Sequence, residues 1–377
     1  MSCRQEIYKR LGDYIREVDV RNSAMEVNLS QGICNMKYFQ DPRQVSSTPH
    51  LDKIVRTGQF AYNRATTRNG NKISIAYREG ADCTVSSAYC VFYIIDENVL
   101  NPYYLWLWFK RPDFDRYAIF KSHGSAHEFF EFDTLCNTYV PIPPIEEQRE
   151  IVENYLTIQN RIKNNKKTIE KLEDTVQAIY RKIFVEDIDP ENLPTGWRMG
   201  TLDEISETII AGVIPKYENS TFLVLGQKCN NFGQINLDLA KTHIPKPQCP
   251  FLQKGDILIN STGDGTLGRV GQIWFDPNQL AFDSNMTLVR PKRAYIEFAG
   301  ILLSNKQDYF VQISQGSTNQ TRLYCSMIRP LEIVIPSEET SIDFGNKIRP
   351  LKEYIQILND ENKLNERFLN TYLDKVN

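Results

Sequence analysis

The chain has 377 residues, of which 41% are hydrophobic and 24% are charged, and its formal net charge at pH 7 is −3. A chain of this length and composition can bury two separate apolar cores. The small negative net charge excludes a protein that coats nucleic acid through bulk charge alone. The charged start carries no apolar signal region, and no stretch approaches about 18 consecutive apolar residues, so we expect a cytoplasmic protein without a membrane partner.

Eight cysteines are scattered along the chain without a C-x-x-C pair. In a chain without an export signal, this pattern is typical of thiols, so we expect most of them to be buried and expect no metal site. His123 and His127 have the spacing of two metal ligands on one helix face, but the Ser-His-Gly-Ser-Ala-His sequence around them is typical of a loop. We interpret this segment as a polar binding loop.

Residues 1–140 are expected to form a first globular unit. Short segments rich in β-branched and aromatic residues predict strands at Gln59–Tyr62, Ile73–Tyr77 and Cys90–Ile95. The segment Asn101–Phe120 has a proline near its start and aromatic residues throughout, and this pattern predicts one helix.

A basic strip runs through this unit from Lys53 to Arg78. It carries six basic residues and no acidic one, which fits contact with DNA phosphates. In the major groove, arginine and lysine also bind guanine, and asparagine binds adenine. The candidate DNA-binding residues of the first unit are Arg64, Arg68, Asn69 and Lys72. A basic run is also typical of an ordinary solvated surface, and the sequence leaves that alternative open.

Residues 141–186 are predicted to form a long helix. Pro141, Pro143 and Pro144 hold the preceding chain extended, and the glutamates that follow suit a helix N-terminus. Apolar residues then recur at steps of four and three, which is the spacing of a coiled-coil seam. The seam residues of this helix are Ile151, Ile158, Ile162, Ile169, Leu172 and Val176.

Residues 187–196 are rich in proline, acidic residues and turn formers, so we interpret them as a linker. A second globular unit then spans residues 197–336. Its predicted strands are Phe222–Leu225, Asp256–Asn260, Arg269–Phe275 and Thr287–Val289. Polar side chains in the turns of this unit supply its candidate DNA-binding residues, which are Ser261, Thr262, Arg269, Thr318, Asn319, Gln320 and Arg322.

Gly263, Gly265 and Gly268 spell the G-x-G-x-x-G pattern of a dinucleotide-binding loop. Such a loop must open a helix whose N-terminus holds the phosphates, whereas the segment after Gly268 has the pattern of a strand. We therefore interpret the three glycines as a tight connection between strands and expect the chain itself to bind no cofactor.

The sequence offers no convincing catalytic residue. It lacks the G-x-x-x-x-G-K-[ST] motif of ATPases. Asn101-Pro-Tyr-Tyr104 approaches the Asn-Pro-Pro-Tyr motif of amino-methyltransferases, but the second proline is missing and no cofactor loop precedes it. A Glu-x-Lys at Glu361 lies on a predicted coiled-coil helix, which is a poor place for a nuclease metal site. These absences predict a non-catalytic protein.

Residues 337–377 are predicted to form a second long helix, whose seam residues include Ile355, Leu358 and Leu369. An interior proline costs about 3 kcal/mol in a regular helix. Because Pro350 follows Gly345 within this segment, we expect a break or kink near Arg349 and Pro350.

The chain repeats itself once, with a period near 193 residues. The spaced residues Ser122, Gly124 and Ser125 match Ser314, Gly316 and Ser317, and the two long seams also correspond. This repeat is too long for a small solenoid unit. It predicts an α+β protein with two globular domains in tandem pseudo-repeat, joined by two long antiparallel coiled-coil helices.

Several motifs resemble those of the specificity subunit of Type I restriction-modification systems. Val140-Pro-Ile-Pro-Pro-Ile-Glu-Glu-Gln-Arg-Glu-Ile-Val152 is similar to the segment that leads into the family's central helix. Further similar segments follow the family's order along the chain at Leu193–Trp197, Gly255–Thr262 and Gly316–Thr321. The chain departs from the pattern at Ser337–Ser341, where the proline and glutamine of the first copy are absent, and Gly58–Asn63 is a weak counterpart of Gly255 onward.

This resemblance implies two target recognition domains, each reading half of a split sequence in double-stranded DNA, with the helices setting their separation. It implies two modification subunits as partners, which bind S-adenosylmethionine and methylate adenine. It also implies restriction subunits, which use ATP and Mg²⁺ to translocate and cleave DNA. The residues alone leave two other classes open. A DNA methyltransferase or nuclease fragment would use the near-motif at Asn101–Tyr104, and a coiled-coil scaffold would bind only protein.

Overall fold

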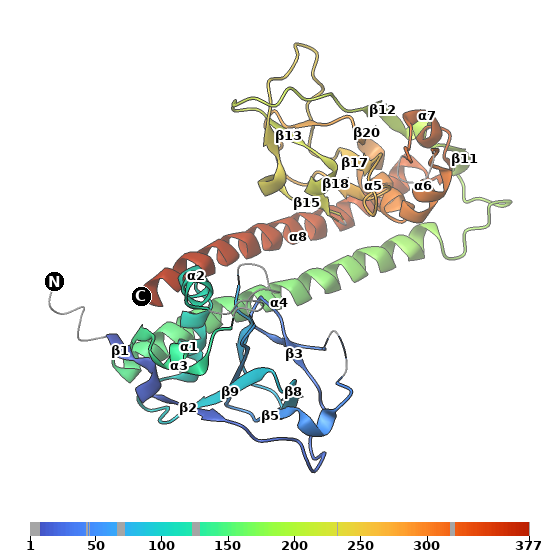
Figure 1. Ribbon diagram of the computed structural model, residues 1–377. Coiled ribbons are helices and arrows are strands. Elements are labelled where there is room, and N and C mark those ends of the chain that lie inside the picture. The colour runs from blue at the N-terminus through green and yellow to red at the C-terminus, as the bar shows by residue number, and fades with distance from the viewer. Residues whose placement is uncertain are drawn as a thin grey trace. The chain divides into compact units, whose positions relative to one another are not determined.

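A computed structural model describes residues 8–42, 44, 46–65, 72–122, 129–231, 233–316 and 321–376. The chain divides into two compact units, and each is described by itself. The first unit comprises Met1–Lys163 and Asn362–Asn377, and the second comprises Asn164–Glu361. Figure 1 labels the elements of both units. Within the described ranges, no helix is long and apolar enough to cross a membrane.

The first unit is built on a four-stranded antiparallel sheet. Its strand order is β2-β9-β6-β7, formed by Ile15–Val18, Tyr89–Ile94, Phe60–Asn63 and Ile75–Tyr77. Three smaller antiparallel pairs accompany it: β1 (Tyr8–Arg10) with β10 (Tyr139–Pro141), β3 (Gly32–Ile33) with β4 (Phe39–Gln40), and β5 (Lys53–Val55) with β8 (Cys83–Val85). A short 3-10 helix, η1, spans Leu11–Asp13.

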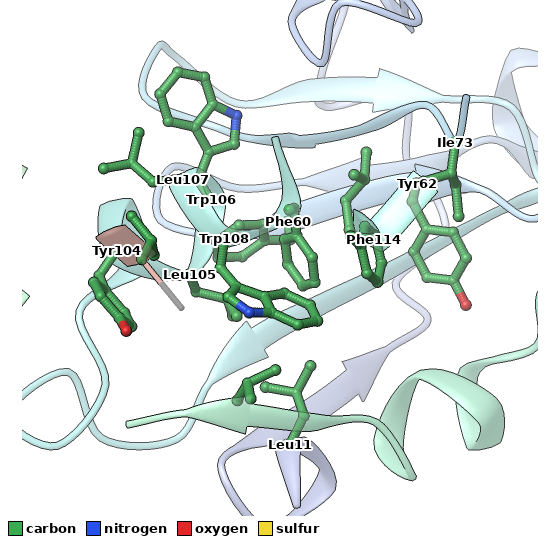
Figure 2. Packing of buried hydrophobic residues seen from close by; sticks show 14 of the residues in the cluster. Leu11, Phe60, Tyr62, Ile73, Tyr104, Leu105, Trp106, Leu107, Trp108 and Phe114 are labelled. Atoms are coloured by element: carbon green, nitrogen blue, oxygen red, sulfur yellow. The ribbon is translucent and has the colours of Figure 1, made fainter. Parts of the chain in front are cut away.

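Three short helices bury the apolar side chains of this sheet. They are α1 (Pro102–Phe109), α2 (Pro112–Lys121) and α3 (Phe132–Cys136). Phe60 on β6 stacks on Phe92 of β9 with ring centroids 5.0 Å apart, and Phe109 lies edge-on to Phe60 at 5.9 Å. Figure 2 shows Phe60, Trp108 and Phe114 within this core. Aromatic rings of this size each bury a large apolar area.

The single helix expected over Asn101–Phe120 is wrong, because the segment folds as two helices, α1 and α2. Pro112 begins α2. Proline has no N–H to continue the hydrogen-bond ladder of α1, and it holds Arg111 in an extended conformation. The chain therefore turns between the helices, and both bury aromatic side chains in the same core.

The second unit repeats the same strand order. Its sheet is β12-β20-β17-β18, formed by Ser206–Ala211, Met286–Pro291, Ile257–Asn260 and Val270–Gln272. The remaining strands are β11 (Arg198–Thr201) with β21 (Glu332–Ile335), β16 (Lys241–Thr242) with β13 (Leu223–Leu225) and β19 (Ala281–Phe282), and β14 (Asn230–Asn231) with β15 (Gln234–Ile235). Its helices are α5 (Ile296–Ser304), α6 (Gln307–Ile313) and α7 (Cys325–Ile328). Short 3-10 turns complete both units: η2 (Pro49–Leu51), η3 (Leu202–Ile205), η4 (Gln227–Cys229), η5 (Leu237–Leu239) and η6 (Arg293–Tyr295).

The predicted duplication is confirmed by individual backbone hydrogen bonds. In the first unit the N–H of Phe130 donates to the carbonyl of Arg64 at 2.9 Å, and in the second Leu323 donates to Ser261 at the same distance. The strands predicted from sequence are all present, with ends that differ by a few residues. The largest difference is at β18, which ends at Gln272 rather than at Phe275.

Two long helices, α4 (Ile145–Phe184) and α8 (Glu338–Tyr372), follow the two copies, and a 3-10 turn, η7 (Leu373–Val376), extends α8. Within the second unit they run antiparallel. Asn165 donates to Glu361 at 3.0 Å, Lys352 pairs with Glu173 at 2.6 Å, and the rings of Phe184 and Phe344 lie 4.9 Å apart. The residue numbers of α4 rise along these contacts while those of α8 fall, which shows that the two helices run in opposite directions.

The first unit contains its own antiparallel pair, made from the start of α4 and the end of α8. Tyr155 and Ile162 share an apolar cluster with Leu369, Tyr372 and Val376. All nine predicted seam residues belong to such clusters. Ile162, Ile169, Val176, Ile355, Leu358 and Leu369 are buried, and Ile151, Ile158 and Leu172 are partly buried against them.

Of the break or kink expected near Arg349 and Pro350, the break is wrong, because α8 continues through Pro350 as one helix. The proline removes one internal hydrogen bond. Packing on both sides offsets that loss: Phe344 and Ile348 are completely buried before the proline, and Ile355 is buried after it. Tertiary burial thus overrides the local preference of the sequence.

Gly345 makes room for a carboxylate from the domain. A Cβ at this position would lie 2.7 Å from the Oε2 atom of Glu297 on α5. The Glu297 side chain is 3% exposed and pairs with Arg349 of α8 at 2.7 Å. The glycine that weakens the helix pattern therefore leaves the space that the Glu297 carboxylate occupies beside α8.

A buried glutamine joins α4 to the first domain. Gln148 is completely buried, and its side-chain oxygen accepts the N–H of Asn101 at 2.8 Å. Its side-chain nitrogen donates to the carbonyls of Val99 and Pro143 at 2.9 and 2.7 Å. One amide thereby fixes the start of α1 against the start of α4, which gives a structural reason for the glutamine in this motif.

Lys110 forms a second contact between α1 and α4. Its ammonium lies 4.2 Å from the ring centroid of Trp106 and donates to the hydroxyls of Tyr38 and Tyr155 at 3.2 and 3.0 Å. Burial, together with the smaller effect of the nearby charge of Lys37, lowers the pKa of Lys110 to about 8. The Lys110 ammonium thus lies among aromatic side chains in a site from which most water is excluded, and this environment disfavours its charged form.

Ile348→Ala should destabilise the protein, and Ile357→Ala should not. Both isoleucines lie on α8 in the second unit, but Ile348 is 0% exposed and Ile357 is 62% exposed. We expect the first change to lower the free energy of unfolding by about 2–5 kcal/mol and the second to change it by no more than about 0.5 kcal/mol. Urea unfolding measures both values, and equal losses would contradict the packing described for α8.

Stability should rise with pH as Lys110 loses its proton. Between its folded pKa of about 8 and the ordinary value near 10.5, the unfolded chain binds a proton that the folded chain does not, so stability increases with pH in that window. The gain from pH 7.5 to 9.5 should be about 1–2 kcal/mol greater in the native protein than in Lys110→Met. Urea unfolding at both pH values tests this, and an identical pH dependence would refute it.

Candidate nucleic-acid interface

The described candidates of the second unit lie together where β17 ends. The N–H of Ser261 donates to the carbonyl of Asn285 at 2.7 Å, and Leu323 donates to the carbonyl of Ser261 at 2.9 Å. Arg322 precedes that contact, and its guanidinium donates to the carbonyl of Ser284 at 2.6 Å. Residues distant in sequence thus meet at one edge of the sheet.

Thr262 and Arg269 lie at the two ends of the glycine connection between β17 and β18. The Thr262 hydroxyl donates to the Oε1 atom of Gln227 at 3.0 Å, and Arg269 donates to the carbonyl of Gly265 at 2.7 Å. Gly263, Gly265 and Gly268 have φ angles of 104°, 68° and 77°, which favour glycine. The segment after the loop is β18, so the glycines join two strands and do not open a helix, as predicted.

The structure does not support Ser261 as a DNA-binding residue. Its side chain is 2% exposed, and its hydroxyl shares a hydrogen bond with the hydroxyl of Thr287 at 2.7 Å. A buried hydroxyl with a protein partner is not available to a base or a phosphate. From the sequence, Ser261 is the first polar residue after a strand, so the pattern predicts that it lies outside the sheet. In the structure it still packs against β20.

In the first unit, Arg64 occupies the position that Ser261 has in the second, since both accept the equivalent backbone hydrogen bond. The Arg64 side chain is 39% exposed, donates to the carbonyl of Ala88 at 3.2 Å and pairs with Glu131 at 3.4 Å. Lys72 is exposed, with its Nζ atom 3.9 Å from the sulfur of Met36. Both cations face accessible surface.

Five candidates and the histidine loop lie outside the described residues. They are Arg68 and Asn69 in the first unit, Thr318, Asn319 and Gln320 in the second, and the loop with His123 and His127. Their assignment as contact residues stays a prediction from sequence.

A buried ion pair anchors the chain beside Lys72. The Nζ atom of Lys37 lies 2.6 Å from Asp115, and the two side chains are 4% and 8% exposed. The same Asp115 oxygen accepts the N–H of Ile73, the residue after Lys72, at 3.1 Å. Burial lowers the pKa of Lys37, against the opposing effect of Asp115, and Lys72 contributes to the lowering. The ion pair thus fixes the backbone from which Lys72 projects.

Sequence reasoning missed Gln227, Lys37 and Asp115, which hold Thr262 and the backbone beside Lys72 in place. Gln227 lies more than thirty residues before the loop it contacts, and Lys37 and Asp115 are separated by 78 positions. No periodicity or motif links them. Only the local polarity of Gly226-Gln-Lys-Cys-Asn-Asn231 could have directed attention to the first of them.

The near-motif of the methyltransferase alternative is a helix cap. The side chain of Asn101 accepts the N–H of Tyr104 at 3.1 Å, so it satisfies one free donor at the start of α1. Tyr104 is buried, and its hydroxyl donates to the carbonyl of Pro141 at 3.2 Å. Both residues therefore have structural partners.

The described cysteines are free thiols. Cys83, Cys90 and Cys229 are buried, and Cys34, Cys136, Cys249 and Cys325 are half-buried, so fewer are fully buried than expected. Burial raises the pKa of the Cys83 thiol to about 11, which makes it a weak nucleophile. In the described ranges, no group of three or more His, Cys, Asp or Glu side chains is placed to hold a metal ion.

Comparisons with known proteins agree with this architecture. The family described as Type I restriction modification DNA specificity domain matches residues 57–174. The Type I restriction enzyme EcoBI specificity subunit of Escherichia coli is 26% identical over 197 residues, which cover 48% of this chain and 40% of that relative. The match thus spans less than half the length of the curated relative.

A solved structure shares the fold. The Type-I restriction-modification system S subunit from M. genitalium superposes with a TM-score of 0.64 at 14% sequence identity, over 98% of this chain and 95% of that one. The duplicated sheet-and-helix unit, closed by two long helices, therefore defines a tandem two-domain protein of this fold. Residues 57–174 of this chain are thus similar to a Type I restriction modification DNA specificity domain, and the chain as a whole shares the fold of a solved S subunit.

Asp115→Asn should destabilise the first unit. The change keeps an acceptor for Ile73 but leaves the Lys37 ammonium buried without its counter-charge, and such a loss costs about 3–5 kcal/mol. Asp13→Asn in the same unit is the control, because Asp13 pairs with Arg10 and the two side chains are 62% and 44% exposed, and a surface pair contributes about 1 kcal/mol or less. Urea unfolding that gave the two variants the same stability would contradict the role of the buried pair.

Proposed function

We propose that this chain is the DNA-binding specificity subunit of a Type I restriction-modification complex, and that it recognises a bipartite DNA sequence. One observation carries the proposal: the same edge of the duplicated sheet bears cationic side chains in both units. Arg64 stands at this edge in the first unit and Arg322 in the second, each next to the equivalent backbone hydrogen bond. A repeated edge of this kind fits a protein that reads two half-sites.

The two edges differ in chemistry, which fits half-sites of different sequence. The first has exposed cations at Arg64 and Lys72, which suit phosphates and guanine. The second combines Arg269 and Arg322 with neutral groups at Thr262 and Gln227, and side-chain amides suit adenine.

The proposal assigns chemistry to partner subunits and recognition to this chain. Two modification subunits would bind S-adenosylmethionine and methylate adenine, and restriction subunits would supply ATP- and Mg²⁺-dependent translocation and cleavage. The chain itself would bind no cofactor, would have no catalytic residue and would act in the cytoplasm, where its DNA substrate lies.

Support for docking of partners on the long helices comes from exposed apolar side chains on α8. Tyr354, Ile357, Leu364 and Phe368 are 47%, 62%, 67% and 47% exposed. Tyr354 and Ile357 belong to the second unit and Leu364 and Phe368 to the first, and within each unit the spacing of the two residues fits packing of a further helix against α8.

Two alternatives make different predictions. A methyltransferase fragment would retain S-adenosylmethionine when purified alone, and the structural partners of Asn101 and Tyr104 give that alternative no support. A coiled-coil scaffold would have no effect on DNA even when its partners are present.

Sequencing of methylated bases in the native host, with and without this gene, tests the proposal. Loss of adenine methylation at one bipartite motif would establish recognition and reveal both half-sites with their spacer. Unchanged methylation, with the partner subunits expressed, would overturn the proposal and favour the scaffold.

Single arginine variants should affect one half-site each. We expect Arg64→Ala to relax one half of the methylated motif and Arg322→Ala to relax the other, with discrimination reduced roughly tenfold to hundredfold at the affected base, since a bidentate contact contributes about 1–3 kcal/mol. If the arginines bind phosphate instead, methylation should fall without a change in the motif. Arg116→Ala and Arg198→Ala are matched controls on exposed cations, with side chains 72% and 54% exposed. If Arg64→Ala and Arg322→Ala both kept the native motif and the native efficiency of methylation, these two arginines would not belong to the interface.

A further inference from the structure

Gln227 is held in the second unit by an unusual set of contacts for a half-exposed side chain. It opens η4, the turn that follows β13. Its side-chain oxygen accepts the hydroxyl of Thr262 at 3.0 Å. Its backbone oxygen accepts the side-chain nitrogen of Asn260 at 3.0 Å. Backbone and side chain are therefore tied to two polar residues of one chain segment, Asn260 on β17 and Thr262 two positions after it.

The hydrogen bonds that hold Gln227 continue from Asn260 into the core. Asn260 is completely buried, and its side-chain oxygen accepts the side-chain nitrogen of Asn230 at 3.3 Å. Asn230 is also completely buried, and it donates to the carbonyls of Leu258 and Arg269 at 3.3 and 3.0 Å. Buried, hydrogen-bonded amides of this kind fix geometry. They place Gln227 relative to the strands rather than leaving it on a mobile turn.

Gly263 leaves space for the Gln227 amide. A Cβ at Gly263 would lie 2.7 Å from both the nitrogen and the oxygen of that amide and 2.3 Å from the hydroxyl oxygen of Thr266. The φ angle of Gly263 is 104°, so glycine serves two purposes at this position. One is the turn, and the other is the close approach of the Gln227 side chain to the loop.

The Gln227 amide keeps capacity for a ligand. Its oxygen has a second lone pair beyond the Thr262 contact. Among the described residues, its nitrogen has no hydrogen-bond acceptor in the protein. A glutamine that served only as structural support would be expected to use both ends of its amide. A planar donor and acceptor, fixed in position beside the loop that begins at Thr262, is the arrangement that reads a base edge.

We propose that Gln227 reads an adenine in the half-site bound by the second unit, with its nitrogen donating to N7 and its oxygen accepting from N6. The pairing follows from the match between a side-chain amide and the major-groove edge of adenine. Thr262 is then a positioning residue, because its hydroxyl holds the amide in the reading orientation. This inference rests on the proposed function and adds a specificity residue to it.

The test compares methylated motifs in the native host for the native gene and for variants of the full chain. We expect Gln227→Ala to relax one adenine position in one half-site, with roughly tenfold to hundredfold less discrimination, and to leave the other half-site and the spacer unchanged. Gln227→Glu should move the preference at that position toward cytosine, since a carboxylate accepts from its N4 amino group. Thr262→Val should relax the same position less. Gln234→Ala, on exposed surface of β15, should leave the motif native.

The outcomes separate the inference from the function on which it rests. If the native gene directs no methylation, the proposed function fails. If the native gene directs a motif and Gln227→Ala retains it unchanged, only the inference fails. If both Gln227 variants abolish methylation, competition binding of the assembled complexes with duplexes altered at single bases decides. An equal loss on every duplex would mean that Gln227 is structural, and a loss confined to one adenine would support the inference.

Discussion

The rest of the structure depends on one constraint: the core of each unit is closed by residues from both long helices. In the first unit Tyr155 of α4 and Leu369 of α8 lie in the same apolar cluster as the sheet, and in the second Tyr180 and Phe344 do so. A four-stranded sheet with three short helices leaves apolar surface uncovered, and burial of that surface is the main driving force of folding. The heptad pattern is therefore part of each core as well as a contact between helices, and the first unit needs residues from the far end of the chain.

The candidate interface depends on buried polar groups just beneath it. Asn230 and Asn260 fix the turn that carries Gln227, and the pair Lys37 and Asp115 fixes the backbone beside Lys72. Buried polar groups stabilise little by themselves, but their hydrogen bonds hold the groups that they contact in one arrangement. Loops held in this way lose little conformational freedom when a ligand binds, which favours discrimination between similar ligands.

The two copies share the same backbone arrangement and differ in side chains that this arrangement does not require. Strand order and the backbone hydrogen bond at Arg64 and Ser261 are the same in both units. The amide of Gln148 joins α1 to α4 in the first copy, whereas the corresponding Ser341 of α8 is 1% exposed and its hydroxyl has no partner among the described residues. In the second copy the hydroxyl of Ser337 accepts the N–H of Thr340 at the start of α8 instead. Such divergence gives two similar scaffolds different surfaces.

The sequence alone determined the features that local patterns encode. Steps of four and three identified the seams of both long helices, segments rich in β-branched and aromatic residues identified the strands, and the repeat identified the tandem architecture. Tertiary structure decided whether Pro350 broke α8, whether Ser261 faced solvent, and which distant residue met Thr262. The continuity of α8 depends on the burial of Ile348 and Ile355. The burial of Ser261 depends on its packing against β20, and Thr262 meets Gln227, which lies 35 positions earlier in the chain. Local periodicity carries no information about such contacts, because their free energy comes from residues that meet only after the chain has folded.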